Sequence, residues 1–336
     1  MSNWYTDKNS INDIAVSTRI RLARNLENLP FPSYMNDEMQ KNLNEQVKKA
    51  ILESDTPFAN SLKYINMGDV PENEIYAMVE RHIISPEFAK SSKGKAIIIS
   101  EDESVCIMIG EEDHIRIQVI LGGLALEKAY EIAEKIDDLL AQKLNFAYDS
   151  QLGYLTECPT NIGTGLRASV MMHLPLMESD KSISELAQTI GKIGFTVRGM
   201  YGEGSKSKAS LYQISNQITL GITEKNAIDN LGVIANQLIA KEKEERKNVD
   251  TIQLEDLVWR AYGTLKNQRV LSSDEMMRLV SKVKIGISEG ILPFENTLPV
   301  QILIETQPFM LCRKYGDRTP QERDILRAKT VRNMMP

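Results

Sequence analysis

Three short apolar runs constrain the fold more than any other feature of the sequence, and they cover residues 95–100, 104–110 and 114–121. In the third run, Ile115, Ile117 and Val119 share one side of an extended chain. Arg116 and Gln118 take the other side, and this alternation is typical of a half-buried strand. The short gaps between the runs admit only tight turns, which join antiparallel neighbours. The sequence therefore predicts an antiparallel sheet in this region.

The pattern changes beyond residue 250, where strand-like runs disappear and the apolar spacing becomes helical. Two helices have clear starts there. Ser272 with Glu275 fits a capping box. Thr319 is the expected N-cap of the other helix, with a proline at the first helical position and Glu322 three residues after the cap. Helices are predicted over 253–267, 273–286, 297–306 and 320–334, and before them over 38–53, 72–84, 124–144 and 223–247, with one more strand near 211–220. We therefore expect an α+β fold, with a mixed domain at residues 1–249 and an all-helical domain at 250–336.

Cysteine, histidine and charge content argue against several classes of protein. The three cysteines, Cys106, Cys158 and Cys312, are far apart, which argues against a disulfide framework or a zinc ribbon, and the three histidines are also scattered. We therefore expect no metal site built from these side chains. The net charge of −6 gives no reason to expect nucleic-acid binding. The polar start and the lack of an apolar run of about 20 residues predict a cytoplasmic protein that does not enter membranes.

Five arginines stand at positions that hydrophobic packing does not explain, namely Arg19, Arg21, Arg116, Arg167 and Arg198. A guanidinium presents a planar fork of donors that matches phosphate oxygens, and a polyphosphate with a transferring group needs several such forks. Taken one at a time, each arginine is more simply a solvated surface residue. Their occurrence together favours a phosphate-binding site.

Two acidic segments accompany these arginines. Glu111, Glu112 and Asp113 lie between the second and third apolar runs, and Glu203 lies in the segment 202–209, which is rich in glycine, serine and lysine. The simpler explanations are an acidic hairpin turn and a plain surface loop. The alternative is a pair of carboxylates that bind a cationic substrate, with the segment 202–209 as a mobile lid over the phosphates.

The loop Cys158-Pro-Thr-Asn-Ile-Gly-Thr at 158–164 is the most specific motif in the chain. Four others accompany it: Val-Ser-Thr-Arg-Ile-Arg at 16–21, Gly-Glu-Glu-Asp-His-Ile-Arg at 110–116, Arg-Ala-Ser-Val at 167–170 and Arg-Gly-Met-Tyr-Gly-Glu at 198–203. In this order they resemble the catalytic domain of the phosphagen kinases, the family of creatine and arginine kinases. The resemblance implies a central antiparallel sheet flanked by helices, with ATP as the phosphoryl donor.

The resemblance also implies roles for individual residues. Glu112 and Glu203 would grip and align a guanidinium, and Cys158 would be its electrostatic or hydrogen-bonding partner rather than a covalent nucleophile. His82 would lie near the adenine, although a structural role on an amphipathic helix explains it equally well. Mg²⁺ would be held mainly by the phosphates of ATP and by water. The residues implied in nucleotide binding are Ser17, Thr18, Arg19, Ile20, Arg21, His82, Arg116, Arg167, Ala168, Ser169, Val170, Met171, Arg198, Gly199, Met200, Tyr201 and Gly202.

The chain departs from the metabolite kinases of that family in two places. In those enzymes the Ser-Thr-Arg motif follows a helical domain that closes over the small substrate, whereas here the motif begins at Ser17, and we expect that domain to be absent. A site without this cover would admit an arginine that is part of a protein. The helical segment after residue 250 has no counterpart in the metabolite enzymes, and this combination resembles the bacterial protein-arginine kinases.

The last predicted helix carries Arg323, Asp324, Arg327 and Ala328, which look like the Arg-Asp-x-x-Arg-Ala motif of the protein-arginine kinases. The resemblance implies that this motif senses phosphoarginine allosterically. A spacing of four residues puts Arg323 and Arg327 on one face of the helix, where they could bind a phosphate. From spacing alone, a solvated face with an Asp324–Arg327 pair is the simpler explanation.

The same resemblance implies partners that the residues themselves do not reveal. They are protein substrates with exposed arginines, a zinc-finger activator protein, a heat-shock repressor, the Clp ATPase and protease, and a second copy of the chain in a homodimer. Phosphorylation would mark proteins for Clp-type degradation and regulate the heat-shock response. Apolar residues of the helical domain could serve a dimer interface or an internal core, namely Leu257, Trp259, Met276, Met277 and Leu279. Two other functions stay open: a metabolite kinase acting on free arginine, and an inactive module that binds phosphoarginine.

Overall fold

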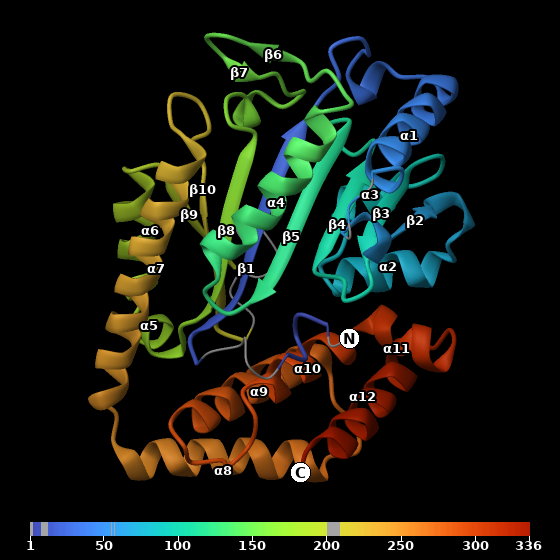
Figure 1. The fold of residues 1–336 in the computed structure, drawn as a ribbon. Helices are drawn as coiled ribbons and strands as arrows, with labels where there is room; N and C mark the ends of the chain where they lie inside the picture. The colour runs from blue at the N-terminus through green and yellow to red at the C-terminus, as the bar shows by residue number, and fades with distance from the viewer. Residues whose placement is uncertain (1–2, 8–12, 55, 57, 200–208) are drawn as a thin grey trace.

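The computed structural model describes residues 3–7, 13–54, 56, 58–199 and 209–336. Within these residues, eight strands form one antiparallel sheet in the order β2-β3-β4-β5-β1-β8-β10-β9 (Figure 1). They are β1 (Ala15–Arg24), β2 (Leu62–Asn66), β3 (Ala96–Ser100), β4 (Val105–Ile109), β5 (Ile115–Gly122), β8 (Leu166–His173), β9 (Phe195–Gly199) and β10 (Leu211–Asn216). The short strands β6 (Tyr148–Asp149) and β7 (Gly153–Tyr154) form a separate ribbon. The three apolar runs at residues 95–100, 104–110 and 114–121 are confirmed as the adjacent strands β3, β4 and β5.

Strand β1 lies near the middle of the sheet, although the sequence indicated only a basic stretch there. It pairs with β5 on one side and with β8 on the other. Ile20 and Leu22 are buried in the core of one face, whereas Arg19 and Arg21 alternate with them and point to the other face. The strand therefore combines a core face with a charged face, which hides its β pattern.

Helices cover one face of the sheet (Figure 1). The helices α1 (Asp37–Leu52), α4 (Leu126–Ala141) and α7 (Glu224–Lys247) pack there, and α5 (Pro175–Ser179) and α6 (Ser182–Gly191) extend this layer beside β9. On the opposite face, α2 (Glu72–Glu80) and α3 (Pro86–Lys90) form a smaller core with alternate residues of β3 and β4, Ile97, Ile99, Cys106 and Met108. The central strands β5, β1 and β8 thus carry their charged residues beside α2 and α3.

A helical region follows α7 and lies below the sheet in Figure 1. It consists of α8 (Thr251–Asn267), α9 (Ser273–Ser288), α10 (Thr297–Glu305), α11 (Pro308–Tyr315) and α12 (Pro320–Met334). Its core also includes Trp4 and Tyr5 from the N-terminal segment and Val16, Ile120 and Leu211 from the sheet. The predicted α+β fold with a helical C-terminal region is confirmed, while the domain division at residue 249 stays a prediction. In the described part of the chain, no helix has the length and apolar character needed to cross a membrane.

Helix α2 is shorter than predicted, and helix α11 was not predicted. The helix predicted over 72–84 ends at Glu80, and His82 follows it with a positive φ of 63°, so His82 does not lie on an amphipathic helix. Helix α11 was not predicted, because its N-terminal amides are capped by a carboxylate distant in sequence: Glu80 accepts hydrogen bonds from the N–H groups of Phe309 and Met310 at 3.0 and 2.8 Å. Both predicted N-caps are confirmed. The reciprocal capping box forms at the start of α12, whereas at the start of α9 the structure shows the bond from the Glu275 N–H to Ser272 Oγ without the reciprocal bond among the described residues.

Candidate active site

The register of the sheet brings the predicted arginines onto the face that carries α2 and α3. Arg21 of β1 lies opposite Arg167 of β8 on one side and opposite Gln118 of β5 on the other. Residues paired in this way share a face. Arg116 lies two residues before Gln118 on β5, so its side chain emerges on the same face.

Arg19 and Arg198 flank this group. Arg19 precedes Arg21 by two residues and donates a hydrogen bond to Gln213 Oε1 of β10 at 3.2 Å. Gln213 is in turn paired with Arg198 of β9, which places Arg198 on the same face. Arg21, Arg116 and Arg167 line one cavity of about 250 Å³. All five predicted arginines therefore gather on one face of the sheet.

The pKa values of these arginines show how strongly like charges are crowded. Burial, with Arg116 and Arg167 nearby, lowers the pKa of Arg19 to about 10. Burial and the same neighbours, together with Arg19, lower the pKa of Arg21 well below its usual value, and burial with Arg198 and Arg116 nearby lowers that of Arg167. A guanidinium nevertheless stays protonated in proteins. The shifts therefore express the cost of burying these cations and, in second place, of bringing them together, and a bound polyphosphate would relieve the repulsion between them.

The β4–β5 turn supplies the carboxylates of the site. Arg116 donates to Glu111 Oε1 at 2.6 Å and to Glu112 Oε2 at 3.0 Å. Glu111 is buried and also accepts a hydrogen bond from Ser85 Oγ at 2.6 Å, whereas the side chain of Glu112 is 43% exposed. Glu112 is thus the carboxylate that an incoming cation can reach, and Glu111 holds Arg116 in place.

Cys158 stands beside Glu112 at the start of a short 3₁₀ turn, Pro159–Asn161. Its Sγ lies 3.1 Å from Thr160 Oγ1, and its side chain is half-buried. Together with Glu112 it lines the cavity that contains Arg21, Arg116 and Arg167. The structure therefore brings together the predicted thiol, the predicted carboxylate and three of the predicted arginines.

A second cavity, of about 390 Å³, shares Glu112 and Cys158 with the first. Its charged lining is mainly acidic, because Glu111, Glu112 and Glu157 contribute to it and Lys95 is the one cation among the described residues that line it. Glu112 and Cys158 line both cavities, so they stand where a cationic and an acidic compartment meet. Sequence reasoning missed Glu157, and only its position directly before Cys158 pointed to it.

A buried hydrogen-bond network fixes the acidic turn against the Cys158 loop. Asp113 Oδ1 accepts from Asn25 Nδ2 at 2.7 Å and from the N–H of Glu157 at 2.9 Å. The N–H of His114 donates to Asn25 Oδ1 at 2.8 Å, and the N–H of Leu26 donates to His114 Nδ1 at 2.9 Å. Burial raises the pKa of Asp113. The sequence indicated Asp113 only as part of an acidic turn, whereas its contacts show a positioning role.

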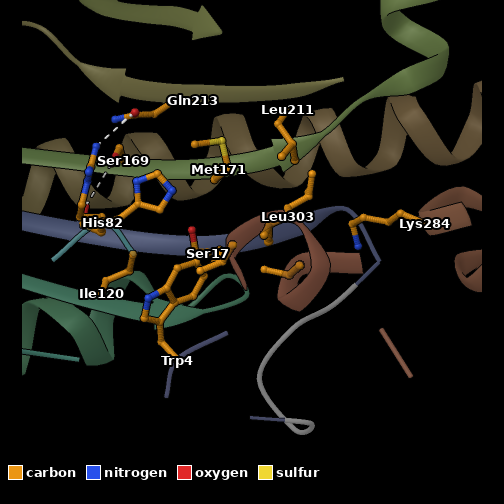
Figure 2. Close-up of a pocket in the computed structure, with 14 residues that line it drawn as sticks. Trp4, Ser17, His82, Ile120, Ser169, Met171, Leu211, Gln213, Lys284 and Leu303 are labelled. Atoms are coloured by element: carbon orange, nitrogen blue, oxygen red, sulfur yellow. Dashed lines mark hydrogen bonds between the residues drawn. The ribbon is translucent and has the colours of Figure 1, made fainter. Parts of the chain in front are cut away.

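His82 lines a third cavity on the same face, together with Ser17, Arg19 and Met171 (Figure 2). Gln118 Nε2 donates to the carbonyl oxygen of His82 at 2.8 Å and so helps to hold its positive φ. Burial, with Arg19 nearby, lowers the pKa of His82 to about 4, so its imidazole is neutral at pH 7. The structure brings these four predicted nucleotide-binding residues together, and Ser169 lines the same cavity.

Several other residues predicted for the nucleotide site lie elsewhere. Ile20, Ala168 and Val170 are buried in the core on the opposite face of the sheet. Thr18 Oγ1 donates to the carbonyl oxygen of Gly123 and accepts from the N–H of Ala125. The side chains of these four residues support the sheet and line none of the three cavities. Gly199 is buried at the end of β9.

Part of the predicted site lies outside the described residues, namely Met200, Tyr201, Gly202, Glu203 and nearly all of the segment 202–209. The pairing of Glu112 with Glu203 therefore stays a prediction. No three histidine, cysteine, aspartate or glutamate side chains converge as a metal site within the residues that are described.

The motif on α12 contains the expected Asp324–Arg327 pair, but its position in the fold differs from the expected solvated face. Arg327 is buried and donates to the carbonyl oxygens of Thr306 and Leu271, both at 2.9 Å, and it pairs with Asp324 at 2.5 Å. Arg323 donates to the carbonyl oxygen of Arg318. The expected solvated face is wrong for Arg327, because its guanidinium lies inside the helical region. Ala328 is also buried. Phosphoarginine sensing here stays a prediction.

Apolar residues of the helical region divide into two groups. Met276 and Met277 belong to the internal core, and Leu279 packs against it. Leu257 and Trp259 on α8 are 40% and 50% exposed. A homodimer interface at these exposed residues stays a prediction.

Comparison with known proteins agrees with this geometry. A family model described as the C-terminal catalytic domain of ATP:guanido phosphotransferases matches residues 42–245, and one described as the protein-arginine kinase McsB C-terminal domain matches residues 251–336. The protein-arginine kinase of Halothermothrix orenii is 42% identical over 341 residues, which cover 100% of this chain and 97% of the relative. That of Caldanaerobacter subterraneus subsp. tengcongensis is 43% identical over 323 residues, covering 95% and 96%.

Comparison with solved structures supports the fold. The crystal structure of a lombricine kinase matches with a TM-score of 0.61 and 20% identity, over 74% of this chain and 73% of the lombricine kinase. At this identity the likeness concerns the fold alone, but the two family models and the full-length relatives together cover nearly the whole chain. The chain therefore belongs to the ATP:guanido phosphotransferase family of enzymes, in the group whose curated members are called protein-arginine kinases.

Proposed function

We propose that this chain transfers the γ-phosphoryl group of ATP to the guanidinium of arginine side chains in proteins. The observation that carries the proposal is the border formed by Glu112 and Cys158 between a cationic and an acidic cavity. The triphosphate would lie on the side of Arg21, Arg116 and Arg167, and the guanidinium on the acidic side. The two reactants would then meet at Glu112 and Cys158. Relatives that bear the name protein-arginine kinase support this choice of substrate.

The chemistry depends on alignment more than on base strength. A guanidinium has a pKa above about 12, and removing its proton completely at neutral pH would cost on the order of 8 kcal/mol. Glu112 can instead bind the N–H groups of the fork and aim one nitrogen at the γ-phosphorus. As the N–P bond forms and the bond to ADP breaks, the proton of that nitrogen passes to the carboxylate. The arginines stabilise the charge on the transferring oxygens.

The acidic cavity supports a substrate that is part of a polypeptide. It is larger than the cationic cavity, about 390 against about 250 Å³, and Glu157 and Lys95 line it in place of Arg21 and Arg167. A cavity of this size leaves room for residues that flank the target arginine. Acidic side chains would favour basic neighbours over acidic ones. Cys158 would hydrogen-bond the guanidinium at the inner end of this cavity.

A phosphoryl-transfer assay with two alternative acceptors tests the proposal. Radiolabelled ATP with Mg²⁺ is offered together with either free arginine or an arginine-rich protein, and the label is followed under conditions that preserve acid-labile phosphoramidates. We expect label on the protein and none on the free amino acid. Label on free arginine alone would indicate a metabolite kinase, and ATP binding without transfer to either would indicate an inactive binding module.

We also propose the cellular setting that the family resemblance implies. The protein is cytoplasmic and homodimeric, and it works with a zinc-finger activator protein, a heat-shock repressor and the Clp ATPase and protease. Proteins that it phosphorylates are degraded by the Clp machinery, and phosphoarginine binding at Arg323 and Arg327 regulates the enzyme. The match of residues 251–336 to the McsB C-terminal domain supports this setting. Reconstituted Clp proteolysis of a substrate with and without prior phosphorylation tests it.

A further inference from the structure

The cavity beside His82 joins the cationic face of the sheet to the helical region. Arg19, Gln213 and Met171 line it from the sheet. Trp4 enters from the N-terminal segment, and the centroid of its indole lies 6.4 Å from that of the His82 imidazole, with 49° between the two ring planes. Figure 2 shows the two rings together at one end of the cavity. Rings and apolar side chains next to a phosphate-binding arginine suit a nucleotide base.

The remaining wall of this cavity comes from the helical region. Val300, Leu303 and Ile304 of α10 line it, and Lys284 of α9 lies at the end opposite Trp4 (Figure 2). Trp4 and these three α10 residues belong to one hydrophobic core, which also includes Ile120 and Leu211 from the sheet. The cavity as a whole is therefore a junction between the sheet, the N-terminal segment and the helices α9 and α10.

Two polar groups at this junction have no hydrogen-bond partner among the residues that the structure describes. Trp4 Nε1 is one of them, in a side chain that is 6% exposed, and Lys284 Nζ is the other, in a side chain that is 1% exposed. Burial, with Arg246 nearby, lowers the pKa of Lys284 to about 8. A buried donor without an acceptor costs about 1–3 kcal/mol. This cost is removed when the wall moves and both donors reach water or the acceptors of a ligand, so the closed junction is less stable than its apolar contacts alone would make it.

The free volume decides how a ligand can enter. The cavity holds about 70 Å³. An engineered cavity of roughly 150 Å³ holds benzene, and a purine is larger than benzene. The sheet side of the cavity is braced by ladder hydrogen bonds on both sides of β1 and β8, so it is the stiffer wall. Space for a base must come from Trp4 and the helical region.

We infer that the purine base of ATP enters this cavity by displacing Trp4 and the α9–α10 wall from the sheet, so that nucleotide binding is coupled to the packing of the helical region. The inference rests on the proposed use of ATP and adds to it a binding wall that the catalytic domain does not supply. ATP binding changes the surroundings of Trp4 and loosens the contact of α10 with the sheet. Conversely, a variant that widens the wall binds ATP more tightly, because less packing must be lost.

The test follows the fluorescence emission of Trp4. The chain has two tryptophans, so a Trp259→Phe variant leaves Trp4 as the single emitter. ATP is titrated into this protein while tryptophan emission and, in parallel, calorimetric heat are recorded. We expect the emission of Trp4 to change with the same Kd as the heat. Tripolyphosphate, which offers the phosphates without a base, should bind to the arginines and leave the emission unchanged.

A matched pair of variants tests the wall itself. Ile304 lines the cavity and is 2% exposed, while Ile302 on the same helix is 0% exposed and does not line it. We expect Ile304→Ala to lower the Kd for ATP by roughly fivefold and Ile302→Ala to leave it within about twofold. Circular dichroism checks folding, and if either alanine variant does not fold, the pair Ile304→Val and Ile302→Val carries the same expectation with a smaller change.

The outcomes separate the inference from the proposed function. If ATP binds by calorimetry while the emission of Trp4 stays unchanged, or if Ile304→Ala weakens ATP binding, the coupling is wrong and the kinase proposal stands. If tripolyphosphate changes the emission as ATP does, the base is not what displaces Trp4 and the inference is also wrong. If no ATP binds to the unaltered chain, the proposed function fails and the inference fails with it.

Discussion

Replacing Arg21 with methionine should stabilise the protein without ATP and weaken its binding of ATP. Arg21 lies among Arg19, Arg116 and Arg167, and its Nε has no hydrogen-bond partner among the described residues. Methionine keeps the apolar stem but removes a half-buried cation that other cations repel. A control variant is available three residues further along the same strand, where Arg24 is buried and paired with Asp137 at 2.7 Å.

The magnitudes follow from these two environments. Relief of like-charge repulsion at Arg21 should add about 1 kcal/mol to the free energy of unfolding, or roughly 2 °C in the unfolding midpoint. Loss of one charge-assisted bond to phosphate costs about 1.5–3 kcal/mol, which raises the Kd for ATP about 10- to 150-fold. Arg24→Met instead leaves Asp137 buried without its partner, and this should lower stability by about 3–5 kcal/mol.

Thermal unfolding with and without ATP, together with calorimetric titration, measures both effects. We expect the Arg21→Met protein to melt slightly above the unaltered protein without ATP and below it when ATP saturates the unaltered protein. The reasoning would be refuted if Arg21→Met lost as much stability as Arg24→Met in the absence of nucleotide. In that case Arg21 would be a structural residue rather than a cation placed to bind the phosphates of ATP.

Three further predictions concern the carboxylates. Glu112→Gln should lower kcat by about 10²- to 10⁴-fold and leave the Kd for ATP within about threefold, and a large change in that Kd would contradict the assignment of Glu112 to the guanidinium. Asp113→Ala leaves the Asn25 amide and the N–H of Glu157 without their acceptor, so we expect a loss of about 2–6 kcal/mol in denaturant unfolding, and a loss below about 1 kcal/mol would contradict the positioning role. Burial raises the pKa of Glu80 from 4.5 to about 7, so its contribution to stability is present below the unfolded pKa and is lost as the pH rises through about 7. The unaltered protein should therefore lose more thermal stability between about pH 5 and about pH 8 than Glu80→Gln, and equal losses would refute this.

Local patterns sufficed to predict part of the fold. The alternation of Ile115, Ile117 and Val119 identified β5 because one face of that strand is core and the other is polar. The N-caps at Ser272 and Thr319 were predictable because a cap is a contact between near neighbours in sequence. Strand β1 was not recognised, because the arginines that alternate with its core residues interrupt the apolar pattern. Helix α11 depends on Glu80, and no local signal marks such a partner.

The sequence motifs of the candidate site were predictable, but the contacts that bring them together were not. The arginines gather through the pairing of β5, β1, β8, β10 and β9, which no spacing along the chain reveals. The motifs indicated the residue types and the resemblance indicated their grouping. Glu157, Asp113 and Trp4 were not predicted as parts of the site or its support. Their positions depend on contacts between segments that are far apart in sequence, and each would look like an ordinary loop or terminal residue by itself.

The most direct test of the proposed site is mass spectrometry of a protein substrate after incubation with ATP and Mg²⁺, under conditions that preserve the N–P bond. Phosphate should be found on arginine side chains with the unaltered enzyme, and it should be nearly absent with Glu112→Gln, even though that variant still binds ATP. Phosphorylation only on serine or threonine, or an equal yield of phosphoarginine from the two proteins, would contradict the assignment of guanidinium transfer to the border between the two cavities.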